Sequence, residues 1–394
     1  MAWERSFSGN SVHNMSNCSK PHKFVELLSP VDKRAERKSV HTMEGGNRCG
    51  RSTLMKKIEN CTLEIMEKIM ENESPSITVR NSKDWRNCDY KEWLTLRSDA
   101  TETRTSFLNS RERFIRVMHM LNKLHQLLMS NSQCSLRQLY YDDVELYGNQ
   151  RQSDDILNFI CKKLDCMPNN LGIIPNSKGL IAGLLKLKMK HDQIDCSTVG
   201  GTKIPDDIRS INHIESNARF ILVVEKETVF RKLLDEDISQ KLGPCILITG
   251  RGFPDLNTRH MLRVLWKKLE IPVFALVDCD PHGIEIMLVY RFGSLSQSQF
   301  GEILAVPSMK WLGVQPRDVI DLHIPSIPLT IEEKRNLEVM CDRQYLKSNP
   351  QLLLEITKMF ESSSKAEIES LYHFSPSYLT NVYLLNKIHS NEFV

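Results

Sequence analysis

The chain has 394 residues, a formal net charge of +3 and 11 cysteines. Its length suggests two or three domains of ordinary size. A charge so close to neutral excludes a strongly basic DNA-coating protein but leaves open an enzyme with a local basic groove. No apolar run approaches the roughly 18 residues of a membrane span, and no apolar segment follows the N-terminus, so neither a membrane contact nor a secretory signal is predicted. The scattered cysteines indicate reduced thiols in an intracellular protein.

Residues 1–52 are rich in Ser, Asn, Lys and Arg and have little periodicity. This composition predicts a disordered polar arm. The basic run at 33–38 is either a nuclear-import patch or a solvated charge cluster. Residues 45–52 imitate a phosphate-binding loop, but Arg51 replaces the required lysine and no apolar strand precedes the loop. We therefore predict no ATP site there.

Residues 53–72 carry apolar side chains at steps of three and four: Leu54, Ile58, Cys61, Ile65 and Ile69. This spacing predicts an amphipathic helix with one apolar face. Such a helix needs a surface to pack on, which is either its own chain or another protein chain. We assign it as a partner-docking helix and keep packing within the chain as the alternative.

A second unit is predicted over residues 105–200. Apolar periodicity favours helices at 108–130, at 135–147 and from Ser153 onward, and residues 185–190 then alternate apolar residues with lysines, as a strand does. Three helices followed by a strand ribbon is the layout of a winged helix-turn-helix domain. That fold places a helix in a DNA groove.

Residues 215–394 have a different pattern. Three short apolar runs, at 220–224, 245–248 and 273–277, alternate with helix-like segments at 228–238 and 258–269. Alternating strands and helices predict a parallel α/β sheet, followed here by a helical C-terminal part. Capping boxes at 330–333 and 364–367 predict helix starts in that part. The fold class expected is a multidomain α/β and α+β protein.

Acidic residues follow two of these strands directly. Glu225 comes after the first run, and Asp278 and Asp280 come after the third. The carboxyl ends of parallel strands meet at one edge of a sheet, and converging carboxylates repel one another unless a cation lies among them. Hard oxygen ligands suit Mg²⁺, so these three residues are the predicted metal site. In the alternative, Glu225 pairs with Lys226 or Arg231 and the aspartates cap a helix.

Four stretches, at 224–230, 249–259, 277–283 and 305–313, carry a family resemblance. They are similar to the Toprim fold of topoisomerases, primases and related nucleases. More narrowly, they resemble the A subunit of topoisomerase VI and its eukaryotic relative, the transesterase that makes meiotic double-strand breaks. The similarity runs from about residue 108 to the C-terminus.

The resemblance also implies a nucleophile. The family carries a tyrosine pair after an arginine, and here Ser135–Tyr141 reads Ser-Leu-Arg-Gln-Leu-Tyr-Tyr. Tyr141 is then the implied nucleophile and Arg137 its electrostatic helper, while Gln138 departs from the acidic residue usual in the family. A phenol with a pKa of about 10 attacks a phosphodiester poorly without such help. The structural alternative for a tyrosine pair on a helix is that one ring lies in the core and the other on the surface. This alternative describes Tyr140, as the core ring.

From the resemblance we expect a Mg²⁺-dependent transesterase that breaks both DNA strands in the nucleus, starts meiotic recombination and leaves a 5′-phosphotyrosyl link. The implied partners are double-stranded DNA, a second copy of the chain in an active homodimer, other meiotic break-formation proteins and a topoisomerase VI B-like ATPase subunit. Two alternatives stay open. One is a catalytically silent DNA-binding scaffold, and the other is the A subunit of a type IIB topoisomerase that religates its breaks.

Four further residues are candidates for DNA contacts. Lys178, Lys186 and Lys188 are the basic ones, and Phe253, in a Gly-rich loop, is the aromatic one. A solvated strand face is the alternative for the lysines. Burial beneath its own loop is the alternative for Phe253.

Overall fold

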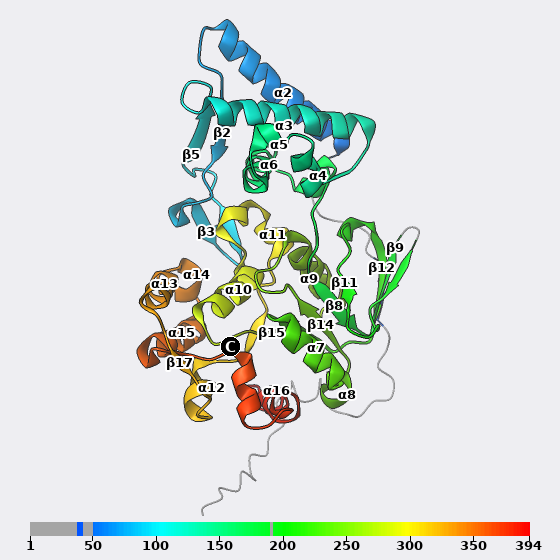
Figure 1. Cartoon of the computed structure of the whole chain (residues 1–394), viewed down its shortest axis with the longest axis vertical. Coiled ribbons are helices and arrows are strands. Elements are labelled where there is room, and N and C mark those ends of the chain that lie inside the picture. Colours follow the sequence, from blue (N-terminus) through cyan, green and yellow to red (C-terminus); the bar gives the residue numbers. More distant parts are fainter. Residues whose placement is uncertain (1–37, 42–49, 190–191) are drawn as a thin grey trace, which may run out of the picture.

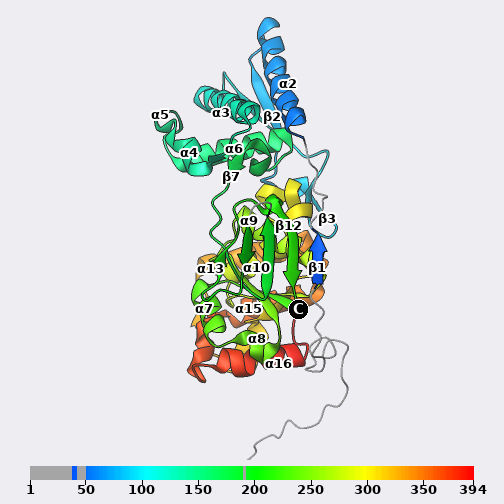
Figure 2. The ribbon, with the colours of Figure 1, turned by 90° about the vertical axis from the view of Figure 1, so that its right-hand side faces the viewer.

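Two separate hydrophobic cores divide the chain into an upper and a lower unit, which Figure 1 and Figure 2 show stacked along the long axis. The structure is a computed structural model, and it describes residues 38–41, 50–189 and 192–394. Nearly all of the basic run at 33–38 and most of the phosphate-loop imitation at 45–52 lie outside these residues.

The upper unit is mainly helical. It contains the helices α2 (Arg51–Met70), α3 (Arg111–Ser130) and α6 (Gln150–Leu164), together with the antiparallel strands β2 (Ser76–Arg80) and β5 (Glu102–Ser106). The three helices carry apolar residues on one face each and bury those faces together. The periodicity therefore predicted all three helices.

The apolar face of α2 packs within its own chain. Leu54, Ile58, Cys61 and Ile65 are at most 4% exposed and belong to the upper core. The prediction that this face docks a partner is therefore wrong, because α3 and α6 already cover it. Of the predicted stripe only Ile69 stays exposed, at 55%.

The helix expected at 135–147 is two helices, α4 (Leu136–Tyr141) and α5 (Val144–Tyr147). The break falls at Asp142 and Asp143. Lys123 of α3 lies 2.9 Å and 2.7 Å from their carboxylates, so a single cation holds both aspartates where the chain turns.

The strand ribbon predicted as a wing belongs to the lower unit, so the winged-helix boundary drawn at 105–200 is wrong at its C-terminal end. The strand β8 (Leu180–Gly183) pairs with a strand of the lower sheet, and β9 (Leu185–Met189) pairs with β10 (Gln193–Asp195) and β12 (Ile211–Ser216). The apolar side chains of β9, Leu185 and Leu187, are buried in the lower core. The alternation predicted a strand, but alternation does not say which core the strand covers.

Four residues of the predicted disordered arm also form a strand, β1 (Lys38–His41). It pairs antiparallel with β12, so this short piece of the arm lies beside the lower unit.

The main sheet of the lower unit has six strands in the order β11 (Thr202–Lys203), β8, β14 (Cys245–Thr249), β13 (Phe220–Val224), β15 (Val273–Leu276) and β16 (Lys310–Gly313). The strands β14, β13, β15 and β16 run parallel. Every residue of β13, β14 and β15 is buried, as their uninterrupted apolar runs predicted. The helices α7 (Glu227–Asp235), α9 (Leu256–Leu269) and α10 (Pro281–Phe292) connect them. The predicted parallel α/β unit is confirmed.

The C-terminal part adds α12 (Pro316–Asp321), α13 (Ile331–Cys341), α15 (Pro350–Ser362) and α16 (Leu384–His389). The capping box at Thr330 is confirmed, since its hydroxyl accepts from the amide of Glu333. The one predicted at 364–367 is wrong. Ser364–Lys365 is a strand, β18, and Ala366 then exchanges two backbone hydrogen bonds with Cys279, which brings this segment to the end of β15.

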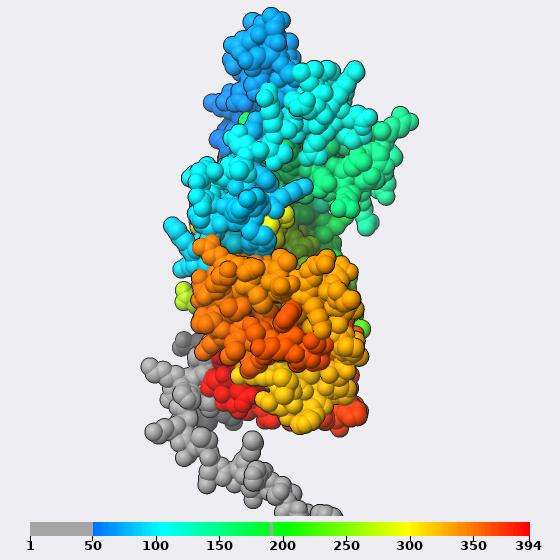
Figure 3. All heavy atoms as spheres, turned by 90° about the vertical axis from the view of Figure 1, so that its left-hand side faces the viewer, coloured from blue at the N-terminus to red at the C-terminus, as the bar shows by residue number. Residues whose placement is uncertain are grey.

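A hairpin joins the two units. The strands β3 (Cys88–Tyr90) and β4 (Leu94–Leu96) leave the upper unit and bury Cys88 and Leu94 in the lower core. Figure 3 shows the cyan surface of this region resting on the orange C-terminal helices. The hairpin therefore ties the upper unit to the lower one through packing as well as through the chain.

Within the residues that the structure describes, no helix combines the length and hydrophobicity that a bilayer crossing requires. The described cysteines are free thiols, and all but Cys341 are buried.

The burial of α2 gives a matched test. Ile58→Ala removes buried atoms from the upper core, so it should lower the free energy of unfolding by about 2–5 kcal/mol. Ile69→Ala, on the exposed side of the same helix, should change it by less than about 0.5 kcal/mol. Urea denaturation followed by circular dichroism measures both. Equal, small losses would contradict the packing described here.

Candidate functional site

Parallel pairing of β13 with β15 brings two of the predicted acidic residues together. Val224 lies opposite Leu276, so Glu225 and Asp278 leave their strands side by side. The amide of Glu225 donates to the carbonyl of Leu276 at 3.1 Å, and the amide of Asp278 donates to Oε2 of Glu225 at 2.8 Å. Both side chains are buried, at 9% and 5% exposed. The adjacency expected from the strand ends is present.

The third acidic residue, Asp280, caps α10. Its Oδ1 accepts from the amide of Gly283 at 2.6 Å, so the capping alternative holds for this aspartate. A Cβ at Gly283 would lie 2.9 Å from Oε2 of Glu225 and 2.4 Å from the carbonyl of Asp278. Only glycine allows α10 to begin so close to the strand-end carboxylates.

Lys226 was named from the sequence only as an alternative partner of Glu225, and its pairing with Asp278 was missed. Its Nζ lies 3.0 Å from Oδ2 of Asp278, 2.9 Å from Glu369 and 3.1 Å from Glu367. The other oxygen of Asp278, Oδ1, accepts from the amide of Ile368 at 2.9 Å. The alternating Glu367 and Glu369 were the available signal, but the interpretation of residues 364–367 as a helix cap obscured it. Neither Lys226 nor Arg231 pairs with Glu225 in the described structure, since Arg231 pairs with Glu227.

Two of the strand-end carboxylates have raised pKa values. Burial and then the neighbouring Asp278 and Asp280 raise the pKa of Glu225 to about 7. Burial also raises the pKa of Asp278, although the amide of Ile368 and the ammonium of Lys226 oppose it. Partial burial lowers the pKa of Lys226, but its bonds to Glu369, Asp278 and Glu367 outweigh this and raise it. The carboxylates at this edge therefore outnumber the one ammonium, Lys226, that pairs with them.

The donor chemistry of this edge fits a hard divalent cation. Oε1 of Glu225 and Oδ2 of Asp280 take part in no hydrogen bond with the described residues. Both oxygens of Asp278, in contrast, are engaged. As the side chains stand, the described part of the chain contains no group of three His, Cys, Asp or Glu side chains drawn together around a metal-sized space. Glu225, Asp278 and Asp280 stay the predicted metal ligands, and in this structure Asp278 is paired with Lys226.

The predicted nucleophile lies in the upper unit. Ser135 caps α4 by accepting from the amide of Gln138 at 3.1 Å, and Tyr141 ends that helix with its side chain 66% exposed. Arg137, four residues earlier and so one turn away, is also exposed. Tyr140 instead packs against the upper core, and its hydroxyl donates to the carbonyl of Gly148 at 3.4 Å. The expected division into one packed and one surface ring is present.

Tyr141 is not brought to the acidic residues. Among the described residues, no hydrogen bond or ion pair involves the Tyr141 side chain, and its aromatic neighbour is Tyr140, with 5.4 Å between the ring centroids. The tyrosine and the carboxylates belong to different hydrophobic units of the same chain.

The three candidate lysines differ in their surroundings. Lys186 lies 3.4 Å from Asp195 and Lys188 2.6 Å from Glu215, so both are paired across the ribbon, as the solvated-face alternative expects. Lys178 is exposed, and its amide donates to Asp255 at 2.9 Å, which places it beside the loop between β14 and α9.

Phe253 projects from that same loop. Its ring is 47% exposed, so it is not buried beneath the loop. The loop is fixed at its base, where the amide of Gly252 donates to the carbonyl of Glu225 at 3.0 Å and Arg251 pairs with Glu227 at 2.8 Å. The exposed aromatic ring is therefore held close to the acidic edge.

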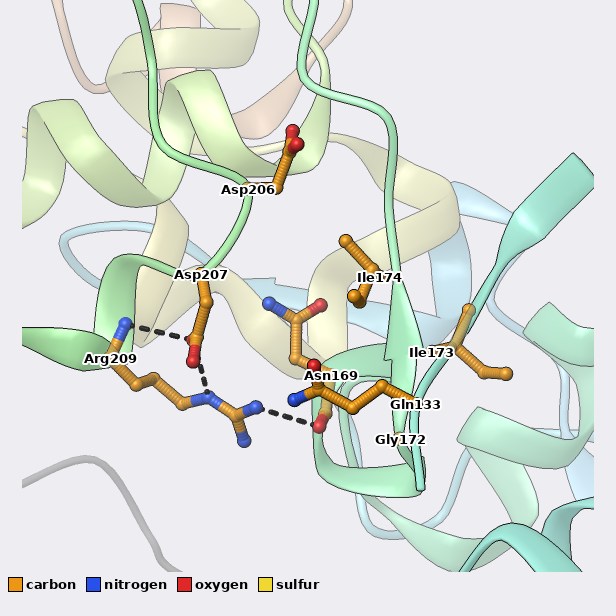
Figure 4. Close-up of a pocket in the computed structure, with 8 residues that line it drawn as sticks. All are labelled: Gln133, Asn169, Gly172, Ile173, Ile174, Asp206, Asp207 and Arg209. Carbon is orange, nitrogen blue, oxygen red and sulfur yellow. Dashed lines mark hydrogen bonds and ion pairs between the residues drawn. The ribbon is translucent and has the colours of Figure 1, made fainter. Parts of the chain in front are cut away.

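A small pocket lies where the two units meet (Figure 4). The guanidinium of Arg209 crosses this junction, donating to the carbonyl of Asn169 at 2.7 Å and to Asp207 at 3.3 Å. None of the residues that line the pocket is a predicted site residue. The pocket belongs to the connection between the units.

Two protein-family models match the chain. One describes the Toprim domain shared by Spo11 and the A subunit of topoisomerase 6, and it covers residues 220–388, including all three strand-end carboxylates. The other, described as "Type IIB DNA topoisomerase", covers residues 112–173 and includes the tyrosine pair.

Individual relatives extend over more of the chain. The meiotic recombination protein SPO11 of Homo sapiens is 38% identical over 355 residues, which is 87% of this chain and 89% of that protein. The protein of the same name from Mus musculus is 36% identical over 90% of this chain and 92% of its own length. The A subunit of DNA topoisomerase 6 from Arabidopsis thaliana is 35% identical over 70% of this chain and 65% of its own length.

The raised pKa of Glu225 predicts a pH-dependent stability in the metal-free protein. The unfolded chain ionises near the ordinary value of 4.5, whereas the folded protein holds its proton up to about pH 7. The contribution of Glu225 to stability is therefore complete below pH 4.5 and is lost as the pH rises toward 7, by about 3 kcal/mol in all. Glu225→Gln cannot ionise, so it should remove this slope and be the more stable protein above pH 7. Thermal melts in EDTA across this range measure the difference.

Glu236→Gln is the matched control. Burial raises the pKa of Glu236, but the ammonium of Lys232 at 2.9 Å outweighs this and lowers it. This substitution should therefore reduce stability at neutral pH. If Glu225→Gln also lost stability at neutral pH, the ionised Glu225 carboxylate would not be destabilising, and the prediction would be contradicted.

Proposed function

The chain belongs to the family of Spo11 and the topoisomerase VI A subunit, and on that basis we propose that it is a transesterase that makes the DNA double-strand breaks of meiotic recombination. Membership gives it a topoisomerase-like role in meiotic recombination. The chemistry, the residues and the partners described in this subsection are the proposal.

The observation that carries the proposal is the surface position of Tyr141. An aromatic ring is stabilised when its large apolar surface is buried, yet this ring is 66% exposed while the adjacent Tyr140 packs on the core. An exposed phenol can reach a phosphate of a bound duplex, and a guanidinium one turn away offers it positive charge. Tyr141 is the proposed nucleophile and Arg137 the group that stabilises charge on the phenolate and the phosphorane.

The reaction is an exchange of phosphate esters. The phenol of Tyr141 loses its proton, and its oxygen bonds to the scissile phosphorus. The bond from phosphorus to the 3′ oxygen breaks, and that oxygen leaves as a 3′ hydroxyl after gaining a proton. The product is a 5′-phosphotyrosyl link, and neither an oxidant nor ATP is consumed in the step.

Glu225, Asp278 and Asp280 are the proposed ligands of Mg²⁺. When bound, this ion supplies Lewis-acid stabilisation of negative charge on the scissile phosphate and on the leaving 3′ oxygen. The buried, mutually repelling carboxylates support this assignment, because a cation relieves their repulsion.

The placement of Tyr141 and the acidic edge in two different units supports a dimer as the active form. Tyr141 and the acidic edge sit in different units of one chain, so the tyrosine of one copy is proposed to work with the acidic edge of another. A two-fold axis then sets one nucleophile against each strand of the duplex. Lys178 and Phe253, both exposed beside the acidic edge, are the proposed DNA contacts of this region. The proposed site of action is the nucleus.

A B-like ATPase subunit is the proposed partner of the upper unit, and other break-formation proteins complete the assembly. The surface that supports this is the outer side of α2, where Leu63, Met66, Ile69 and Met70 are each more than half exposed. Figure 3 shows α2 projecting at the end of the molecule, away from the lower unit. This strip replaces the buried face as the docking surface.

The first test concerns the nucleophile. Tyr141→Phe removes only the attacking oxygen, so the protein should fold and bind DNA but form no covalent protein–DNA adduct. Tyr140→Phe should keep most of the adduct, because adjacent helical residues point roughly 100° apart and only one can face the phosphate. Adduct recovery from cells in meiosis measures both. Loss of the adduct in Tyr140→Phe alone would move the assignment by one residue, and full adduct in both variants would place the nucleophile elsewhere in the chain. Absence of any adduct from the parent protein would leave the scaffold interpretation.

The second test concerns the partner. Met66→Asp combined with Ile69→Asp should abolish co-purification with the B-like partner and should leave the melting temperature of the free chain within a few degrees, because both side chains are exposed. Leu354→Asp, an exposed residue of the C-terminal part at 56%, is the control and should leave the association intact. Retained association in the double variant would exclude this strip.

A further inference from the structure

We propose that Lys226 is an internal counterion that competes with a divalent cation for Asp278. The inference rests on the metal site of the proposed function and names a residue that sets how tightly that site binds. In the metal-free chain the ammonium neutralises the carboxylate, and a cation must displace it.

Only one oxygen of Asp278 carries no backbone hydrogen bond, and Lys226 and a divalent cation would both bind to it. Oδ1 accepts from the amide of Ile368, which is itself held in place because Ala366 exchanges two backbone hydrogen bonds with Cys279. Oδ2 is the remaining oxygen, and Nζ of Lys226 lies 3.0 Å from it. A metal ligand and an ion-pair partner cannot share that oxygen at full strength. Binding of the cation and the contact from Lys226 are therefore opposed.

Two other carboxylates can keep the Lys226 ammonium paired once it leaves Asp278. Glu369 and Glu367 lie 2.9 Å and 3.1 Å from Nζ, and both are more exposed than Asp278. Lys226 can release Asp278 and stay paired with these two carboxylates. Its displacement then costs less than separating an isolated buried ion pair.

This arrangement makes two substitutions act in opposite directions. Lys226→Met removes the competitor and should tighten cation binding. Glu369→Gln removes one of the alternative partners, holds the ammonium more firmly on Asp278 and should weaken cation binding. If Glu369 acts through Lys226, its substitution should have little effect once Lys226 is methionine.

The experiment measures binding of Mn²⁺, as a spectroscopic substitute for Mg²⁺, to the full chain by electron paramagnetic resonance of the free ion. Lys226→Met should lower the dissociation constant by about fivefold or more, the lower end of coupling between two linked sites. Glu369→Gln should raise it by about threefold, again a modest coupling. Lys232→Met is the control, since Lys232 is as exposed as Lys226 at 28%, lies in the following helix α7 and pairs with Glu236 instead. It should leave the constant unchanged.

Thermal melts in EDTA and in Mn²⁺ provide a second readout. Lys226→Met should melt lower than the parent protein in EDTA, because Asp278 then lacks a cation, and should gain more from added Mn²⁺. Weaker or unchanged Mn²⁺ binding in Lys226→Met would overturn the inference, as would an equal effect of Glu369→Gln in both backgrounds. If Lys226→Met fails to fold, Lys226→Gln, which also removes the charge, takes its place in the same two-background comparison. Asp280→Asn should abolish Mn²⁺ binding by the parent protein. If the parent protein binds no Mn²⁺, or binds it equally well with this substitution, the metal site of the proposed function fails instead.

Discussion

The pairing of two parallel strands underlies the rest of this structure. Because β13 and β15 are neighbours in register, Glu225 and Asp278 emerge at one point and the amide of the second bonds to the carboxylate of the first. That edge is buried, and burial together with neighbouring carboxylates raises the pKa of Glu225 and of Asp278. The start of α10, the loop that carries Phe253 and the segment 364–369 all attach to these strand ends. The metal site proposed for this chain lies at this one edge.

The local sequence pattern predicted the helices and the buried strands. Short apolar runs such as Phe220–Val224 are buried on both faces because helices cover both sides of a parallel sheet, so both the strands and the acidic residues at their ends could be predicted. What covers a face is a property of the whole chain. Ile58 was assigned to a partner-docking face but packs within its own chain. Leu187 was assigned to the wing of the upper domain but joins the lower core. Periodicity encodes neither outcome.

The contacts of Lys226 mark the limit of sequence reasoning at the site. This lysine and Glu369 are 143 residues apart, and they meet only because Ala366 pairs with Cys279. Tyr141 is the opposite case. A six-residue helix capped by Ser135 sets its exposure locally, so the residue that the family resemblance pointed to is also the one that the fold leaves on the surface.

The central claim is that the Tyr141 oxygen becomes linked to DNA. The most direct measurement is to isolate the protein from cells in meiosis, digest bound DNA to a short remnant and locate that remnant by mass spectrometry of proteolytic peptides. The account predicts a 5′-phosphate-linked nucleotide on Tyr141 and none on Tyr140. A remnant on another residue, or a 3′ linkage, would contradict it.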